Sequence, residues 1–192
     1  ILVFLPGLEE IRRCARAIAP MAEEEGWLLL PLHGRLSAEE QDRALAPAPR
    51  RKVILATNVA ETSLTIEGVR TVIDAGLARF AHHDPDRGLE RLDLGRISRA
   101  SAAQRAGRAG RTGPGRCVRL WSERDERGMP EFDVPEVRRV DLAATVLALR
   151  AWGHTDPRKF GWFEPPPGES LEGAERMLTM LQAIEPATGA LT

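Results

Sequence analysis

Short, continuous runs of apolar residues alternate along the chain with segments of helical periodicity. The runs occupy residues 1–5, 27–32, 52–57, 69–76 and 116–121. Because they are short, uninterrupted and rich in Val, Ile and Leu, they are typical of strands buried on both faces of a parallel sheet. Leu8, Ile11, Ala15 and Ile18 follow the first run at helical spacing, in a helix that Pro20 is expected to limit or kink. This alternation predicts an α/β fold in which helices flank a parallel sheet.

Two local signals add detail to this sheet. Ser37 and Glu40 match a capping box, which predicts a short helix ending at about Leu45. Residues 77–97 separate the fourth and fifth runs, and the turn-forming stretch "DPDRG" lies inside them. We expect this segment to form a β-hairpin insertion.

The composition changes after residue 122. Residues 123–140 are charged and poor in pattern, which predicts a linker. Asp141 is placed to cap a helix ending at Gly153, and a second helix is expected near Leu171 and Leu178. These roughly 50 residues are too few for an independent core. We therefore expect a first domain at 1–122, a linker at 123–140 and a truncated second unit at 141–192.

Composition narrows the functional classes without selecting one. The 192 residues carry a formal net charge of −1, and 43% of them are hydrophobic. The sequence holds no apolar run long enough to span a membrane, so we expect no membrane partner. Cys14 and Cys117 lie far apart and fit no metal spacing, which suits a reducing, cytoplasmic location and predicts no metal ligands in this chain.

Positive charge is concentrated in one window of this nearly neutral chain. Between Gly95 and Ser122 there are seven arginines and no Asp or Glu. A local basic stretch in a neutral protein indicates a specific anion site more than general attraction to nucleic acid.

The stretch "QRAGRAGR" at residues 104–111 forms the centre of this window. A capping-box pattern at Ser101 predicts a helix from about Ala102 to the glycines at 113–115. On such a helix Gln104, Arg108 and Arg111 share one face. The small residues, Gly107 and Gly110 among them, fall on another side that can approach a neighbouring backbone. Guanidinium groups match phosphate oxygens bidentately, so this face is a candidate phosphate clamp. The alternative is a solvated basic helix face.

Several stretches together resemble the DEAH-box branch of the superfamily 2 helicases. "QRAGRAGR" is similar to motif VI, "ATNVAETSLTIEGV" to motif V, and "ILVFLPG" to the start of motif IV. The resemblance covers nearly the whole chain and is strongest to the bacterial HrpB-type members. It implies that residues 1–121 form a second RecA-like domain. Residues 140–192 would open a winged-helix domain.

The resemblance also implies a role for individual residues. Arg108 and Arg111 would be arginine fingers for ATP held mainly by a first RecA-like domain, and Gln104 would position the attacking water or the phosphate. A Gln104 engaged in the capping box could not do this, which is a conflict within the prediction. Thr65 and Glu67 would lie near the ribose or phosphates. The path of single-stranded RNA or DNA would be lined by Gly34, Arg35, Thr57 and Asn58.

The same resemblance implies an ATP-dependent RNA helicase that moves 3′ to 5′ and uses ATP and Mg²⁺. Its hairpin, at residues 77–97, would help to separate strands. Relatives in the family carry an aromatic residue for adenine stacking where this chain has Leu45, so we expect several nucleoside triphosphates to be accepted. Many also have Asp at the position of Glu67 and Ser at that of Ala56.

Two motifs that the family needs are absent from the sequence, the phosphate loop G-x-x-x-x-G-K-[ST] and an Asp-Glu-x-His stretch. We expect both, together with the Mg²⁺ ligands, in a preceding first RecA-like domain. The chain alone is therefore expected to be inactive as an ATPase, and its apolar first residues suggest an excised fragment.

A non-catalytic RecA-like module that binds nucleic acid or a protein remains an alternative. A metabolic phosphate-binding enzyme is a weaker one. The choice between RNA and DNA and the biological substrate stay open.

Overall fold

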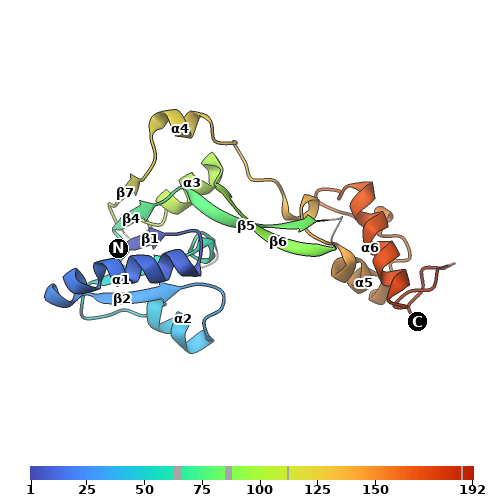
Figure 1. Cartoon of the computed structure of the whole chain (residues 1–192), viewed down its shortest axis with the longest axis horizontal. Coiled ribbons are helices and arrows are strands. Elements are labelled where there is room, and N and C mark those ends of the chain that lie inside the picture. The colour runs from blue at the N-terminus through green and yellow to red at the C-terminus, as the bar shows by residue number, and fades with distance from the viewer. Residues whose placement is uncertain (63–65, 85–87, 112, 187) are drawn as a thin grey trace. The chain divides into compact units, whose positions relative to one another are not determined.

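A parallel five-stranded sheet forms the centre of the computed structural model, which describes residues 1–192 apart from 63–65, 85–87, 112 and 187 (Figure 1). The strand order is β2-β3-β1-β4-β7. The strands are β1 (Leu2–Phe4), β2 (Leu28–Leu32), β3 (Lys52–Ala56), β4 (Thr71–Asp74) and β7 (Arg116–Arg119). Each neighbouring pair is parallel, and each strand lies within one of the apolar runs of the sequence. The predicted α/β fold with a parallel sheet is confirmed.

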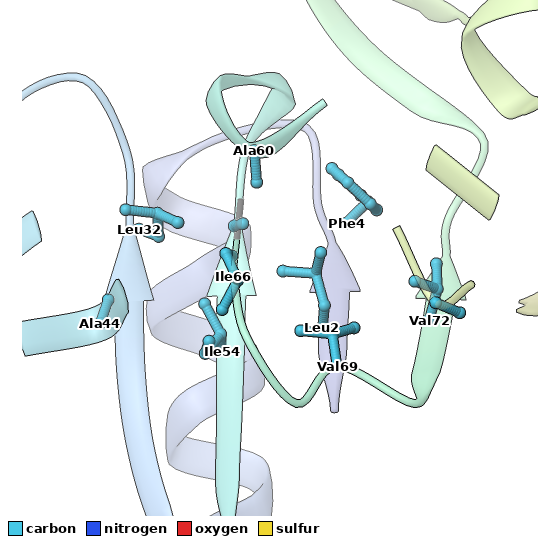
Figure 2. Packing of buried hydrophobic residues seen from close by; sticks show 11 residues of the cluster. Leu2, Phe4, Leu32, Ala44, Ile54, Ala60, Ile66, Val69 and Val72 are labelled. Atoms are coloured by element: carbon cyan, nitrogen blue, oxygen red, sulfur yellow. The ribbon is translucent and has the colours of Figure 1, made fainter. Parts of the chain in front are cut away.

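Side chains of successive strand residues point to opposite faces of this sheet, and each face has its own core. Leu2, Phe4, Ile54 and Val72 belong to one core. Figure 2 shows them beside residues of the long connection between β3 and β4. The intervening strand residues, such as Val3, pack in a second core on the opposite face.

Helix α1 (Leu8–Glu24) covers the face that carries Val3. Ile11 is its most buried residue next to the sheet. The helix continues past Pro20, so of the two expected effects of this proline, limiting or kinking the helix, the first is wrong. The last turn is held beyond the proline because Ala22 is buried and its carbonyl accepts a hydrogen bond of 2.8 Å from the backbone N–H of Trp27.

Helix α2 (Ala38–Leu45) begins where the sequence predicts. The Ser37 hydroxyl accepts from the N–H of Glu40 at 3.3 Å, and the Glu40 carboxylate accepts from the N–H of Ser37 at 2.9 Å. This reciprocal pair satisfies two N–H groups that a helix start leaves without intrahelical partners. The capping box at Ser37 is confirmed.

The insertion is a two-stranded hairpin of β5 (Leu77–Asp84) and β6 (Leu89–Arg96). It follows Gly76, whose φ of 72° lies in the left-handed region that glycine adopts without strain. Gly76 therefore allows the chain to turn directly from β4 into the hairpin. The predicted hairpin is confirmed.

The described chain divides into two compact units. The first, called the sheet unit, comprises residues 1–79 and 94–133. The second, called the helical unit, comprises residues 80–93 and 134–192. The helical unit holds η2 (Glu136–Arg138), α5 (Ala143–Ala151), η3 (Pro157–Lys159) and α6 (Gly168–Met180). Its core joins α5 to α6 through Val146, Leu171 and Leu178. The N-cap residue of α5 is Leu142 and not the expected Asp141, although the Asp141 carboxylate accepts from the N–H of Ala143 at 2.9 Å.

Residues 123–140, expected to be a linker, contain a short helix, α4 (Glu123–Arg127). Ser122 and Asp125 form a capping box at its start, with each side chain accepting from the other residue's backbone N–H. Sequence analysis missed this signal because the segment has no apolar period. None of the helices among the described residues is long and apolar enough to cross a membrane.

Candidate functional site

The four predicted nucleic-acid residues all lie at the carboxyl edge of the sheet. Gly34 and Arg35 follow β2, and Thr57 and Asn58 follow the adjacent strand β3. The backbone N–H of Thr57 donates to the carbonyl of Leu32 at 3.1 Å, which ties the two strand ends together. Gly34, Arg35 and Asn58 are exposed and Thr57 is partly exposed. The structure therefore brings these four residues to one accessible edge.

A single helical turn continues from this edge. It is η1 (Asn58–Ala60), and Thr57 lies at its N-cap position without a side-chain capping hydrogen bond. The N–H of Ala60 donates to the carbonyl of Thr57 at 3.2 Å, and the N–H of Glu61 donates to that of Asn58 at 2.9 Å. Glu61 is consequently fixed one turn beyond the carboxyl edge of the sheet.

Helix α3 (Arg99–Ala106) starts three residues earlier than the sequence predicts. Ser98, not Ser101, is its N-cap residue, and the Ser98 hydroxyl accepts from the N–H of Ser101 at 3.0 Å. Ser98 is completely buried, and its own N–H donates to the carboxylate of Asp133 at 3.0 Å. This tertiary contact fixes the helix start. Gln104 is exposed and takes no part in a capping box, which removes the conflict in its predicted role.

The helix also ends earlier, at Ala106, and residues 107–110 form turns. Arg108 and Arg111 therefore lie beyond α3, and the prediction that they share a helix face with Gln104 is wrong. The N–H of Arg108 donates to the carbonyl of Arg105 at 3.1 Å. This i to i−3 hydrogen bond closes a tighter turn than the i to i−4 hydrogen bond of an α-helix. Gly107, the residue at the C-cap, carries the lowest helix propensity apart from proline, which accounts for the early end.

The residue of the arginine segment whose role sequence analysis missed is Arg105, which is a buried structural residue. Its side chain is 1% exposed, the largest of the fully buried side chains. Its Nε donates to the carboxylate of Glu61 at 2.9 Å, and its Nη1 donates to that of Asp74 at 3.0 Å. The guanidinium also lies over the ring of Phe4, with 4.8 Å between its central carbon and the ring centroid. One arginine thus joins α3 to η1, β4 and β1.

Asp74 is the buried partner in this cluster. It is fully buried at the end of β4, and its Oδ1 accepts both from Arg105 and from the N–H of Gly76 at 2.9 Å. The sequence left open whether Asp74 belongs to a site or caps a loop. It caps the turn at Gly76 and also neutralises the buried guanidinium.

Arg108 and Arg111 differ in exposure but interact. Arg108 is 6% exposed, and its Nη2 donates to the backbone carbonyl of Glu61. Arg111 is exposed. Burial lowers the pKa of Arg108, the nearby Arg111 lowers it further, and Glu61 opposes the change. Two guanidinium groups close enough to repel each other are suited to an anion that lies between them.

The glycine that this segment requires is Gly115 and not Gly107 or Gly110. A Cβ on Gly115 would collide with the carbonyl group of Ala109, whereas one on Gly110 would meet nothing within 4 Å. A Cβ on Gly107 would meet only backbone of the turn preceding it. The close approach of Gly115 lets the chain fold back from the arginine turn to the start of β7.

A cavity of about 600 Å³ opens at the amino edge of the sheet. The first residues of three strands, Lys52, Thr71 and Arg116, line it together with Glu67. Its other basic lining residues are Arg50, Arg51 and Arg70. The predicted ribose residue Glu67 thus faces a strongly basic cavity, whereas Thr65 lies outside the described residues. The described residues contain no group of three or more His, Cys, Asp or Glu side chains that could hold a metal ion.

Comparison with known proteins agrees with this geometry. The family model described as helicase conserved C-terminal domain matches residues 1–113. The probable ATP-dependent RNA helicase DHX34 of Mus musculus is 48% identical over 179 residues, which are 91% of this chain and 16% of that protein. The ATP-dependent RNA helicase HrpB of Escherichia coli is 46% identical over 188 residues, which are 96% of this chain and 23% of that protein.

The match extends to three dimensions. The crystal structure of the Escherichia coli DEAH/RHA helicase HrpB superimposes with a TM-score of 0.88 and 44% identity, over 100% of this chain and 24% of that one. The chain therefore spans between 16% and 24% of the length of these relatives. Both units have counterparts in a longer protein of known fold.

Replacing Arg105 with Met tests the buried cluster. Arg105→Met leaves the carboxylate of Asp74 buried without its guanidinium partner, and loss of one side of a buried ion pair costs about 3–5 kcal/mol. We expect a decrease of that order in the free energy of unfolding, measured by urea denaturation of the 192-residue chain. Arg12→Met is the matched control, because its 2.6 Å ion pair with Glu9 is largely exposed and worth about 0–1 kcal/mol. Equal losses in both variants would contradict the assignment.

Replacing Gly115 with Ala tests the return of the chain from the arginine turn. The added methyl group collides with Ala109, and overpacking of this kind costs about 1–3 kcal/mol. We expect thermal unfolding of Gly115→Ala to occur at a lower temperature than that of the wild type. Gly110→Ala, whose methyl group enters open space, should unfold at nearly the wild-type temperature. A larger loss at Gly110 would show that the wrong glycine has been identified.

Proposed function

The chain belongs to the family described as the helicase conserved C-terminal domain, and from this we propose that it is the C-terminal motor half of an ATP-dependent RNA helicase. The observation that carries the proposal is the match of residues 1–113 to this family, within which Arg108 and Arg111 lie in the segment that follows α3. In this role both bind the phosphates of ATP held mainly by a first RecA-like domain. An arginine of this kind typically accelerates phosphoryl transfer by about 10³–10⁵-fold, because it stabilises charge in the transition state.

The environment of the turn supports arginine fingers over a merely solvated basic surface. The carboxylates of Glu61 and Asp74 both bind Arg105. Arg108 contacts Glu61 through a neutral backbone carbonyl, so its positive charge is not cancelled by that hydrogen bond. We propose that Gln104, exposed on α3, orients the attacking water or the phosphate.

We propose that the two edges of the sheet bind different ligands. Gly34, Arg35, Thr57 and Asn58 bind the backbone of single-stranded RNA at the carboxyl edge. Small polar side chains and backbone N–H groups suit phosphate oxygens and distinguish no base sequence. At the amino edge the basic cavity and Glu67 receive the nucleotide ribose or phosphates. The family resemblance assigns the same role to Thr65.

The remaining parts of the proposal rest on the family resemblance. ATP hydrolysis requires Mg²⁺, whose ligands we assign to the first RecA-like domain. The β5–β6 hairpin helps to separate strands, and the helical unit opens a winged-helix domain. We further propose that the whole protein works in the cytoplasm and that this chain alone does not hydrolyse ATP.

Removing the Arg108 guanidinium tests the motor proposal. In the full-length protein, Arg108→Ala should reduce RNA-stimulated ATP hydrolysis by about 10³-fold or more, because a transition-state contact is lost. The dissociation constant for single-stranded RNA, measured by fluorescence anisotropy, should stay close to the wild-type value. Arg12→Ala, which removes an exposed arginine of α1, should retain full hydrolysis. An equal loss of RNA binding in Arg108→Ala would assign the arginine to the RNA path instead.

The position of Leu45 predicts weak selection among nucleoside triphosphates. Leu45 packs against the core of the sheet and offers no aromatic ring to a base. We expect the full-length protein to show similar kcat/KM values for ATP and GTP in a steady-state hydrolysis assay. An ATP preference above about tenfold, equivalent to roughly 1.4 kcal/mol, would mean that other residues read the base.

A further inference from the structure

We propose that Glu61 and Arg105 are positioning residues that hold the Arg108 turn at a fixed distance from the nucleic-acid edge. This inference rests on the proposed function and adds to it a residue-level connection between the two ligand sites. Neither residue needs to touch ATP or RNA. The contacts that carry the inference all lie within the sheet unit.

Glu61 binds the arginine segment twice, with different groups. Its carboxylate accepts from the Nε of Arg105, and its backbone carbonyl accepts from Arg108. Arg105 and Arg108 are themselves joined by a backbone hydrogen bond of 3.1 Å. The three residues therefore form a closed loop of hydrogen bonds, in which a displacement of Glu61 must displace Arg108 or break a contact.

Arg105 makes this loop rigid. Its guanidinium is held on one side by Asp74 and on another by the ring of Phe4, and its Nη1 also donates to the carbonyl of Leu77 at 3.3 Å. A charged group that is 1% exposed cannot leave its partners without a large desolvation penalty. Arg105 is thus an anchor in the core and has no surface available for a ligand.

The other end of the connection is the RNA edge. Glu61 is joined to Asn58 by a backbone hydrogen bond within the single turn of η1, and Thr57 precedes that turn. If RNA binding shifts Thr57 and Asn58, the shift is therefore transmitted through one helical turn to the backbone carbonyl of Glu61, which binds Arg108. A stimulation of hydrolysis by RNA follows if that shift improves the position of the finger.

Glu61→Ala and Glu61→Gln in the full-length protein test this connection. The Glu61 side chain is 14% exposed, and its removal leaves Arg105 paired with Asp74, so both variants are expected to fold. Glu61→Ala should lower the RNA-stimulated kcat by about tenfold, while the KM for ATP and the RNA dissociation constant change by less than about threefold. Glu61→Gln retains an oxygen acceptor for Arg105 and should recover kcat to within about threefold of wild type.

Ile11→Val provides the control for general destabilisation, because it truncates a buried side chain in the core on the opposite face of the sheet. It should retain the wild-type kcat despite a lowered unfolding temperature. A wild-type kcat in Glu61→Ala, a loss confined to RNA affinity, or an equal loss in Ile11→Val would each overturn the inference. If Arg108→Ala abolishes hydrolysis while Glu61→Ala does not, the proposed function stands and only this connection fails. If Arg108→Ala has no effect, the proposed function itself fails.

Discussion

The arrangement of the sheet unit depends on one buried guanidinium. Taking a charge out of water costs several kcal/mol, and the interior accepts it only when partners of opposite charge and good geometry are present. Arg105 has two such carboxylates, one from η1 and one from the end of β4. Because each partner comes from a different element, satisfying this one charge fixes where α3 lies against the sheet. The position of the arginine turn that follows α3 is set by the same requirement.

The strands and their connections could be predicted from the sequence because their signals are local. Short apolar runs form strands with little ambiguity when turn residues and helical periods separate them, and Ser37 with Glu40 marks a helix start within four residues. The start of α3 could not be predicted in this way. Ser101 and Gln104 fit the capping rule better than Ser98 does, yet Ser98 caps the helix because Asp133, 35 residues away, holds its backbone. A local rule was overridden by a tertiary contact.

The candidate site also contains residues whose position the sequence predicts and residues whose position depends on tertiary contacts. Residues of the predicted nucleic-acid path follow adjacent parallel strands, so the topology alone places them at one edge. The ion pairs of Arg105 join residues 44 and 31 positions apart, and no periodicity or motif spacing announces them. The absence of acids from the window 95–122 predicted a specific anion site within it. Arg96, Arg105 and Arg119 instead form ion pairs with acids from outside the window. Counting charges within a window therefore does not establish which of the arginines are available to a ligand.

The connection between β3 and β4 links the two edges of the sheet at which we propose separate ligand sites. It leaves the carboxyl edge at Thr57, crosses the sheet face with Ala60, Ile66 and Val69 packed in the core, and returns to the amino edge beside Glu67 (Figure 2). A strand of four residues spans only about 13 Å, so the two edges are close enough for one segment to contact both.

The three arginines of the motif, which are spaced three residues apart, differ in exposure. Arg105 is 1% exposed, Arg108 is 6% exposed and Arg111 is exposed. Identical side chains in one motif therefore differ in burial, and only the buried Arg105 is an anchor within the core.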